Sequence, residues 1–295
     1  MKRIPLFLFM LVVVYSCNKV GLVNPSFDVT TSKNTYKVGD TVIFNFSGNP
    51  DFIVYYSGEA GFKYQNRNRL TDSGGITQLQ FVSSVSQGNQ TGNLALLISN
   101  NFNGSLDSNS IHSANWIDIT KKATLSTGTA STPSGIVDLS SFQTSGNPYY
   151  IAFKYQTNFA NGTKARQWII GNFQVTNFFP DSCVGNVADD INTAGFQATS
   201  VRGDSLKWSV AATTLKFLPG FPNNIDEDWV ISKPMDFNQV SPDQGVAIKN
   251  TSFQLNDFRY LFSKAGSYDI TFVATNVNGS NQSSVIKQMK LTITP

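Results

Sequence analysis

Few side chains in this sequence are suited to acid–base or nucleophilic chemistry. The 295 residues include one histidine, His112, and two cysteines, Cys17 and Cys183. A Ser–His–acid triad would have to use His112, and the sequence contains no Gly-x-Ser-x-Gly nucleophile motif. A zinc site that needs a pair of histidines is excluded by count. We therefore expect a protein that is not an enzyme and that carries no metal site and no cofactor.

Aromatic side chains offer a different chemistry, because a flat ring can stack on the apolar face of a sugar. Aromatic residues make up 13% of the chain and include four tryptophans. Trp116 and Trp168 lie in strong strand patterns, where filling a sandwich core is the usual role. Trp229 follows an acidic segment and is the first candidate for ligand contact. The further candidate ligand-binding residues are Trp208, Tyr55 and Tyr56.

Two charged segments each allow two interpretations. Asp226-Glu227-Asp228 offers oxygen ligands for Ca²⁺, but the spaced pattern of a calcium loop is absent, which favours a solvated loop. Arg67 and Arg69 either clamp a carboxylate through paired hydrogen bonds or lie on a solvated edge strand. Cys183 has no neighbour in sequence that would lower its thiol pKa, so we expect a small buried residue or an idle thiol.

The N-terminus has the pattern of a secretion signal that ends at Cys17. A basic start, Lys2-Arg3, precedes an apolar run from Ile4 to Tyr15. The run is shorter than the roughly 20 residues that cross a bilayer. The small residue directly before Cys17 resembles a bacterial lipobox, in which the cysteine is acylated. This resemblance implies a signal peptide at 1–16, a membrane-anchoring lipid on Cys17 and a tether at 17–26.

The composition favours an exported β protein with an uncharged polar surface. Charged residues are 14% of the chain, below the usual level of about 25%, and the net charge is +3. No basic run occurs outside Lys2-Arg3, so nucleic acid is excluded as a partner. With one cysteine assigned to lipid, no internal disulfide is expected, and a hydrophobic core must hold the fold together.

The residue pattern predicts an all-β fold. Short runs of β-branched and aromatic residues alternate with turn signals at a spacing of about ten residues, which is typical of a sandwich. Helical periodicity is nearly absent. The strongest predicted strands are 149–155, 167–175, 268–276 and 286–294.

Residues 262–294 resemble the second half of a PKD-type immunoglobulin-like domain, through Phe262, Ala265-Gly266-Ser267-Tyr268 and the strands that follow. The Gly-Asp start of such a domain occurs far upstream, at Gly39-Asp40. Half a sandwich would leave strand edges and an apolar face in water. We therefore expect 27–69 and 236–295 to form one discontinuous Ig-like sandwich, with two independent sandwiches in tandem as the alternative.

The middle of the chain, 75–235, resembles the jelly-roll modules of the choice-of-anchor and cleaved-adhesin type. The matching segments are 98–104, 116–120, 135–139, 150–155 and 168–175. This resemblance implies an inserted jelly-roll domain. The two resemblances together cover most of the mature chain and look like an uncharacterised lipoprotein family of the Bacteroidota. Many such lipoproteins accompany glycan-uptake systems.

These features together predict an outer-membrane lipoprotein that is a non-catalytic binding module for carbohydrate. Its expected partners are the membrane, through the lipid on Cys17, a polysaccharide and outer-membrane glycan-uptake proteins. The sequence leaves open whether it faces the cell surface or the periplasm. One alternative is an adhesion or structural surface protein that binds a protein partner. A second is a glycoside hydrolase, which requires paired carboxylates in a cleft.

Overall fold

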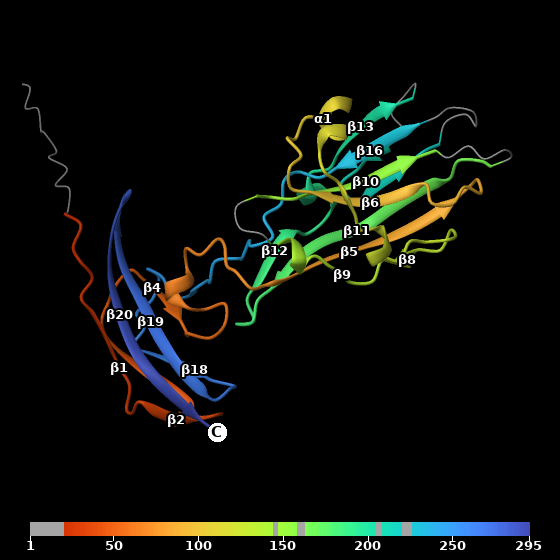
Figure 1. The fold of residues 1–295 in the computed structure, drawn as a ribbon. Coiled ribbons are helices and arrows are strands. Elements are labelled where there is room, and N and C mark those ends of the chain that lie inside the picture. The colour runs from red at the N-terminus through yellow and green to blue at the C-terminus, as the bar shows by residue number, and fades with distance from the viewer. Residues whose placement is uncertain (1–20, 144–146, 158–162, 204–207, 220–225) are drawn as a thin grey trace, which may run out of the picture. The chain divides into compact units, whose positions relative to one another are not determined.

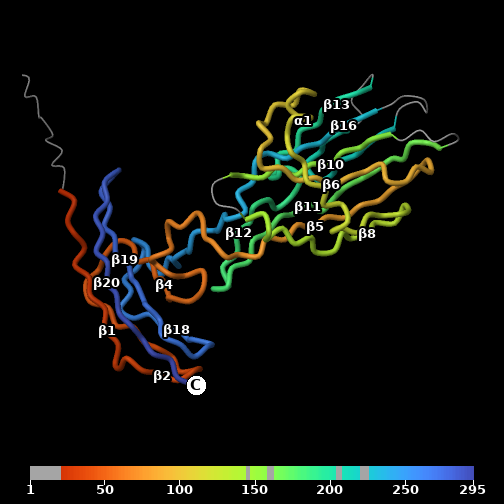
Figure 2. Tube along the Cα trace, in the orientation of Figure 1, coloured from red at the N-terminus to blue at the C-terminus, as the bar shows by residue number. Residues whose placement is uncertain are grey.

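The computed structural model describes residues 21–295 except 144–146, 158–162, 204–207 and 220–225 (Figures 1 and 2). The chain separates into two compact units, one formed by residues 21–59 and Gly245–Pro295 and the other by Ala60–Gln244. Both units consist mainly of antiparallel strands, so the expected all-β fold with sandwich-like sheets is confirmed. The predicted signal peptide 1–16, Cys17 and the first part of the tether lie outside the described residues.

The first unit is built from strands at both ends of the chain. Its strands are β1 (Phe27–Thr30), β2 (Thr35–Lys37), β3 (Thr41–Gly48), β4 (Phe52–Tyr56), β17 (Val246–Lys249), β18 (Asp257–Leu261), β19 (Gly266–Asn278) and β20 (Asn281–Thr294). One sheet has the order β1-β3-β18 and the other the order β17-β4-β19-β20-β2. The only parallel pairing described in this unit joins β2 to β20.

The core of the first unit explains why its two parts need each other. Alternate residues of a strand face opposite sides of a sheet, and on β3 this buries Val42 and Phe44 while Ile43 stays partly exposed. The rings of Phe44, Tyr55 and Phe272 pack together with centroid distances of 5.1 to 5.7 Å. Phe44 and Tyr55 come from the N-terminal part and Phe272 from the C-terminal part, so neither part alone encloses this core.

The second unit contains the remaining strands and all the short helices of the described chain. Its strands are β5 (Ile76–Ser86), β6 (Leu94–Ser99), β7 (Ile117–Asp118), β8 (Thr132–Pro133), β9 (Val137–Asp138), β10 (Tyr150–Gln156), β11 (Gln167–Phe178), β12 (Val184–Ala188), β13 (Gln197–Arg202), β14 (Trp208–Val210), β15 (Thr214–Phe217) and β16 (Glu227–Ile231). Its helices are α1 (Ser108–Ser113), α2 (Ile191–Ala194) and the 3₁₀ turns η1 (Tyr64–Asn66), η2 (Thr120–Lys122) and η3 (Ser140–Phe142).

Two sheets enclose the core of the second unit. One has the order β13-β16-β10-β6-β7, and the other the order β14-β15-β11-β5-β8, with β12 added to β11 and β9 added to β5. Phe153 of β10 packs against Phe81 and Phe173 of the opposite sheet, with ring centroids 5.2 and 6.4 Å apart. One face of each sheet therefore packs in the core, and the opposite face points away from the core.

The connecting segments belong to the second unit, so the units divide at residues 59/60 and 244/245 rather than at the expected 69–75 and 235/236. The amide of Val240 donates to the carbonyl of Leu70 at 3.0 Å. Arg69 forms ion pairs with Asp72 at 2.6 Å and with Asp243 at 3.3 Å. Arg69 also pairs with Asp181 at 3.4 Å, and the amide of Ser241 donates to the carbonyl of Val184 at 3.3 Å, so both segments are bonded to the rest of the second unit.

Candidate functional site

A hollow lies on the outer face of the five-stranded sheet of the second unit. Ala95 of β6 is paired with Lys154 of β10, and Lys154 is paired with Trp229 of β16, so the three side chains share one face. The small side chain of Ala95 leaves space between its larger neighbours. We call this hollow of about 500 Å³ the Trp116 groove. Its lining residues are Gly92, Asn93, Ala95, Leu97, Ile111, His112, Ala114, Asn115, Trp116, Asp118, Lys154, Gln156 and Trp229.

One wall of the Trp116 groove is the segment of residues 100–116, which contains α1 and packs on the outer face of the sheet (Figure 1). Asn101 fixes both ends of this segment, because its Oδ1 accepts hydrogen bonds from the Asn115 amide at 2.8 Å and the Ser99 hydroxyl at 2.9 Å. Ile111 is the residue of α1 whose side chain is buried. The indole of Trp116 donates to the Ile111 carbonyl at 3.0 Å.

Trp116 presents the aromatic surface of the groove. Its ring lies 5.1 Å from the ring of Trp229 and 5.4 Å from that of Phe102, centroid to centroid. Trp229 is only 3% exposed, whereas Trp116 is half-buried. Trp229 therefore supports the ring of Trp116 from below, and Trp116 is the residue that a ligand could reach.

A charged cluster lies beside the two tryptophans. Oε1 of Glu227 accepts hydrogen bonds from Trp229 Nε1 at 2.9 Å and His112 Nε2 at 3.1 Å, and Lys154 Nζ lies 3.4 Å from the same oxygen. Burial by itself would raise the pKa of Glu227. The hydrogen bonds from Trp229 and His112 and the charge of Lys154 outweigh it, and the pKa lies below its usual value. This carboxylate is thus held in its charged form.

The expectation that Asp226-Glu227-Asp228 forms a solvated loop is wrong. All three residues are buried, and β16 begins at Glu227. The strand is hydrogen-bonded to β10 on one side and to β13 on the other. A central strand position removes these side chains from water, and their local sequence carries no signal of that position.

The four residues predicted from the sequence to bind ligand do not form one site in the structure. Tyr55 lies in the core of the first unit, and Tyr56 is half-buried on β4 of the same unit. Trp208 packs against Phe217 in the core of the second unit and is 3% exposed. Trp229 alone lines the Trp116 groove. Burial leaves no ring face of Tyr55 or Trp208 open to a ligand, so both are left out of the candidate site.

Sequence reasoning missed three components of the site, His112, Lys154 and Trp116. The single histidine was noted only as a limit on catalysis. Trp116 was assigned to a core because its neighbours form a strand, but β7 begins one residue later, at Ile117. The outward position of Lys154 follows from the two-residue period of β10, which is a signal that the sequence does contain. Trp168 is buried in the core as expected.

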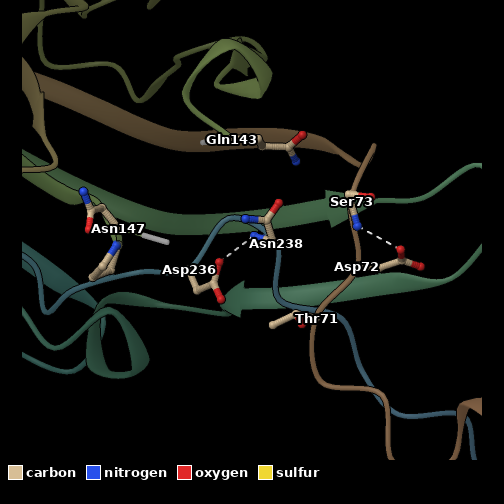
Figure 3. A pocket seen from close by; sticks show the side chains of 8 residues that line it. Thr71, Asp72, Ser73, Gln143, Asn147, Asp236 and Asn238 are labelled. Carbon is tan, nitrogen blue, oxygen red and sulfur yellow. Dashed lines mark hydrogen bonds between the residues drawn. The ribbon is translucent and has the colours of Figure 1, made fainter. Parts of the chain in front are cut away.

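A second cavity in the same unit is larger, and its lining residues are of polar types apart from one proline (Figure 3). Its volume is about 780 Å³, and its lining residues are Thr71, Asp72, Ser73, Gln143, Asn147, Pro148, Asp236 and Asn238. Several of these groups are already used within the protein. The side-chain amide of Gln143 donates to the hydroxyl of Thr77 at 2.7 Å. The carboxylate of Asp72 accepts hydrogen bonds from the Arg69 guanidinium and from the backbone amide of Ser73. With no aromatic side chain in its lining, this cavity is the weaker ligand-site candidate.

The guanidinium of Arg69 is engaged by carboxylates of the protein itself. It is bound to Asp72, Asp181 and Asp243, all within the second unit. The guanidinium of Arg67 lies over the ring of Tyr64, 4.0 Å from its centroid. Cys183 is buried nearby, and burial raises the pKa of its thiol.

The described residues hold neither a cluster of metal ligands nor a membrane-spanning helix. In this part of the chain, no three His, Cys, Asp or Glu side chains are grouped so that they could hold a metal ion. No helix among the described residues is both long and apolar enough to cross a membrane.

The fold and the groove define an all-β protein of sandwich-like units with an aromatic hollow on the outer face of one sheet. Residues 16–196 match a family described as a domain of unknown function (DUF5017). The match covers more than half of the chain, and the protein belongs to this family. No curated protein and no solved structure matched the chain. The matched residues include Trp116 and Lys154 and end before β16, which supplies Trp229 and Glu227.

Proposed function

We propose that the protein is a non-catalytic binding module for carbohydrate, and that the Trp116 groove is its ligand site. The observation that carries this proposal is the contact between the tilted rings of Trp116 and Trp229. Trp116, the outer ring of the two, is half-buried and flanked by polar side chains. A supported aromatic ring has a low entropy cost on binding, because its position is already fixed. Such a ring is suited to the apolar face of a sugar.

The polar lining supplies the second part of carbohydrate recognition. The side-chain amides of Asn115 and Gln156 line the groove, and neither has a hydrogen-bond partner among the described residues. An amide side chain both donates and accepts, as a sugar hydroxyl does. The groove volume of about 500 Å³ lies within the range of roughly 300–1,000 Å³ common for small-ligand sites.

The state of Glu227 supports a non-catalytic role. A glycosidase needs a carboxylic acid with a raised pKa to protonate the leaving group. The pKa of Glu227 is lowered by its three partners, and its Oε1 is fully engaged by them. Among the residues that line the groove, Asp118 is the one carboxylate, whereas a glycosidase needs a pair, so the lining does not favour the second alternative, a glycoside hydrolase.

A protein partner remains the second candidate function, favoured by the edge of β20. The 14-residue strand β20 pairs with β19 along its length, while β2 pairs only with Thr292, Ile293 and Thr294. The other residues of β20 thus have one strand partner in the ladders of the described chain. An unpaired edge can accept a strand from another protein.

The membrane attachment is part of the same proposal. The pattern before Cys17 supports an acylated N-terminus in the outer membrane, and the resemblance to Bacteroidota lipoproteins supports association with glycan-uptake proteins. Incorporation of a labelled fatty acid into the chain, and its loss in Cys17→Ala, would test the anchor independently of ligand binding.

A glycan array with the purified full chain tests the binding proposal. We expect binding to at least one plant or host polysaccharide, and loss of that binding in Trp116→Ala. Phe178→Ala is the matched control, because Phe178 is also an exposed aromatic residue, 43% exposed, but lies on β11 in the other sheet. Trp116→Phe should keep part of the binding if stacking is the cause. Absence of binding to every glycan at millimolar concentration would reject the proposal and make the protein partner the leading candidate.

A further inference from the structure

We propose that the Trp116 groove selects neutral glycans over glycans that carry carboxylate groups. This inference rests on the proposed carbohydrate function and names the class of ligand. It follows from the charges that face the groove and from the partners that those charges already have.

Lys154 is the single lysine or arginine in the lining of the groove, and its charge is already paired. Its Nζ lies 3.4 Å from Oε1 of Glu227 and 5.4 Å from the ring centroid of Trp229. The carboxylate of Glu227 is 8% exposed and depends on Lys154 for charge compensation. A ligand carboxylate that recruited Lys154 would weaken this pairing inside the protein, so Lys154 offers little net attraction to an anion.

Asp118 adds an uncompensated negative charge on the opposite side of the lining. Its side chain is exposed, and among the described residues its Oδ1 accepts one hydrogen bond, from the backbone amide of Thr120 at 2.8 Å. With Glu227 paired to Lys154, Asp118 sets the net charge of the groove at −1 while His112 is neutral. A uronic acid in the groove would be repelled by Asp118, whereas a neutral sugar could donate a hydroxyl to it.

The uncharged lining groups fit the same ligand class. Asn93 is committed to the protein, since its amide donates to the Tyr155 hydroxyl at 3.0 Å and its carbonyl accepts from the Trp168 indole at 3.1 Å. Asn115 and Gln156 are the lining amides that a ligand can use. Their donors and acceptors match hydroxyl groups, and the lysine beside them in the lining, Lys154, is already paired with Glu227.

The chain contains its own control for Asp118. Asp138 occupies the same local structure, because each aspartate ends a two-residue strand and precedes a 3₁₀ turn. Oδ1 of Asp138 accepts the amide of Ser140 at 2.8 Å, as Oδ1 of Asp118 accepts that of Thr120. Asp138 pairs through β9 with β5 of the other sheet and does not line the groove.

The test compares two oligosaccharides of the same length and linkage, one of neutral hexoses and one with its C6 positions oxidised to carboxylates. Dissociation constants would be measured by calorimetry on the full chain at low ionic strength and about pH 8, where histidine is usually neutral. We expect the neutral oligosaccharide to bind at least tenfold more tightly. Asp118→Asn should reduce this ratio severalfold, and Asp138→Asn should leave it unchanged.

The outcomes separate this inference from the function on which it rests. Equal or tighter binding of the oxidised oligosaccharide would overturn the selectivity and leave the carbohydrate function intact. A neutral preference that Asp138→Asn reduces as much as Asp118→Asn would also overturn it, because the effect would then not arise in the groove. Absence of binding to a full panel of both kinds would reject the carbohydrate function and this inference together.

Discussion

Lys154 and Trp229 face each other across β10 and β16, with the ammonium nitrogen of Lys154 5.4 Å from the centroid of the Trp229 ring. Both side chains also contact one oxygen of Glu227, so a cation, an indole and a carboxylate form one compact unit on the outer face of the sheet. Charged groups that are buried require such partners. The floor of the groove is therefore rigid before any ligand arrives.

Replacing Glu227 with glutamine should destabilise the second unit by about 1–3 kcal/mol at neutral pH, because charge-assisted hydrogen bonds are lost. The folded-state pKa of Glu227 is lowered, so the carboxylate contributes its full stability above its unfolded pKa of about 4.3. That contribution disappears as the pH falls through the lower, folded value. The difference between wild type and Glu227→Gln should therefore shrink in acid.

Urea denaturation followed by tryptophan fluorescence can measure this difference, because all four tryptophans lie between residues 60 and 244. The signal thus reports the second unit alone. A difference in unfolding free energy that stays constant from neutral pH to below about pH 4 would contradict the assigned role of Glu227.

Arg69→Met should cost about 3–5 kcal/mol of stability in the second unit, because it leaves the buried carboxylate of Asp243 without its cation. Arg67→Met is the matched control two residues away. Arg67 is exposed, with its guanidinium over the half-buried ring of Tyr64, and we expect a change within about 0.5 kcal/mol. Equal effects of the two substitutions in fluorescence-detected denaturation would show that Arg69 is not the residue that holds the connecting segments.

Tyr55→Phe should leave the first unit as stable as wild type or make it more stable by up to about 1 kcal/mol. The hydroxyl of Tyr55 is buried and has no hydrogen-bond partner among the described residues. Tyr155→Phe should instead destabilise the second unit by about 1 kcal/mol, because the Tyr155 hydroxyl accepts hydrogen bonds from Asn93 and the Arg166 amide. Scanning calorimetry of both variants checks the contrast, and a marked loss of stability in Tyr55→Phe would refute it.

Asn101→Ala should loosen the wall of the Trp116 groove, since the side chain of Asn101 binds the amide of Asn115 at 2.8 Å. We expect faster hydrogen exchange of the Asn115 amide and weaker ligand binding, with a stability loss of about 1–2 kcal/mol. Asn100→Ala is the control, because the side chain of Asn100 makes one long hydrogen bond, 3.4 Å to Tyr149. Unchanged exchange at Asn115 in the Asn101 variant would show that the wall is held by other contacts.

The sequence predicted the all-β class because short alternating strands and turn residues are local signals. The burial of Trp168 also followed from its strand pattern. The groove could not be derived in this way. It depends on Trp229 and Trp116, which are more than 100 positions apart in sequence, and on the placement of β16 between β10 and β13.

The acidic segment Asp226-Glu227-Asp228 shows most clearly that burial caused by distant segments cannot be predicted from local sequence. Three consecutive acidic residues indicate a solvated loop by composition, yet Glu227 is buried by partners from α1 and β10. A side chain whose environment is built by distant segments carries no local mark of its burial. The prediction of Tyr55 and Trp208 as ligand contacts is wrong for the converse reason, since local sequence cannot tell an exposed ring from a core ring.

A structure of the full chain with the tightest-binding oligosaccharide is the most direct test of the proposed function. We predict a sugar ring stacked on Trp116, with hydroxyl groups within hydrogen-bond distance of Asn115 or Gln156. A sugar bound instead in the polar cavity of Thr71 and Asp236, or in the first unit, would contradict the assignment of the Trp116 groove as the ligand site.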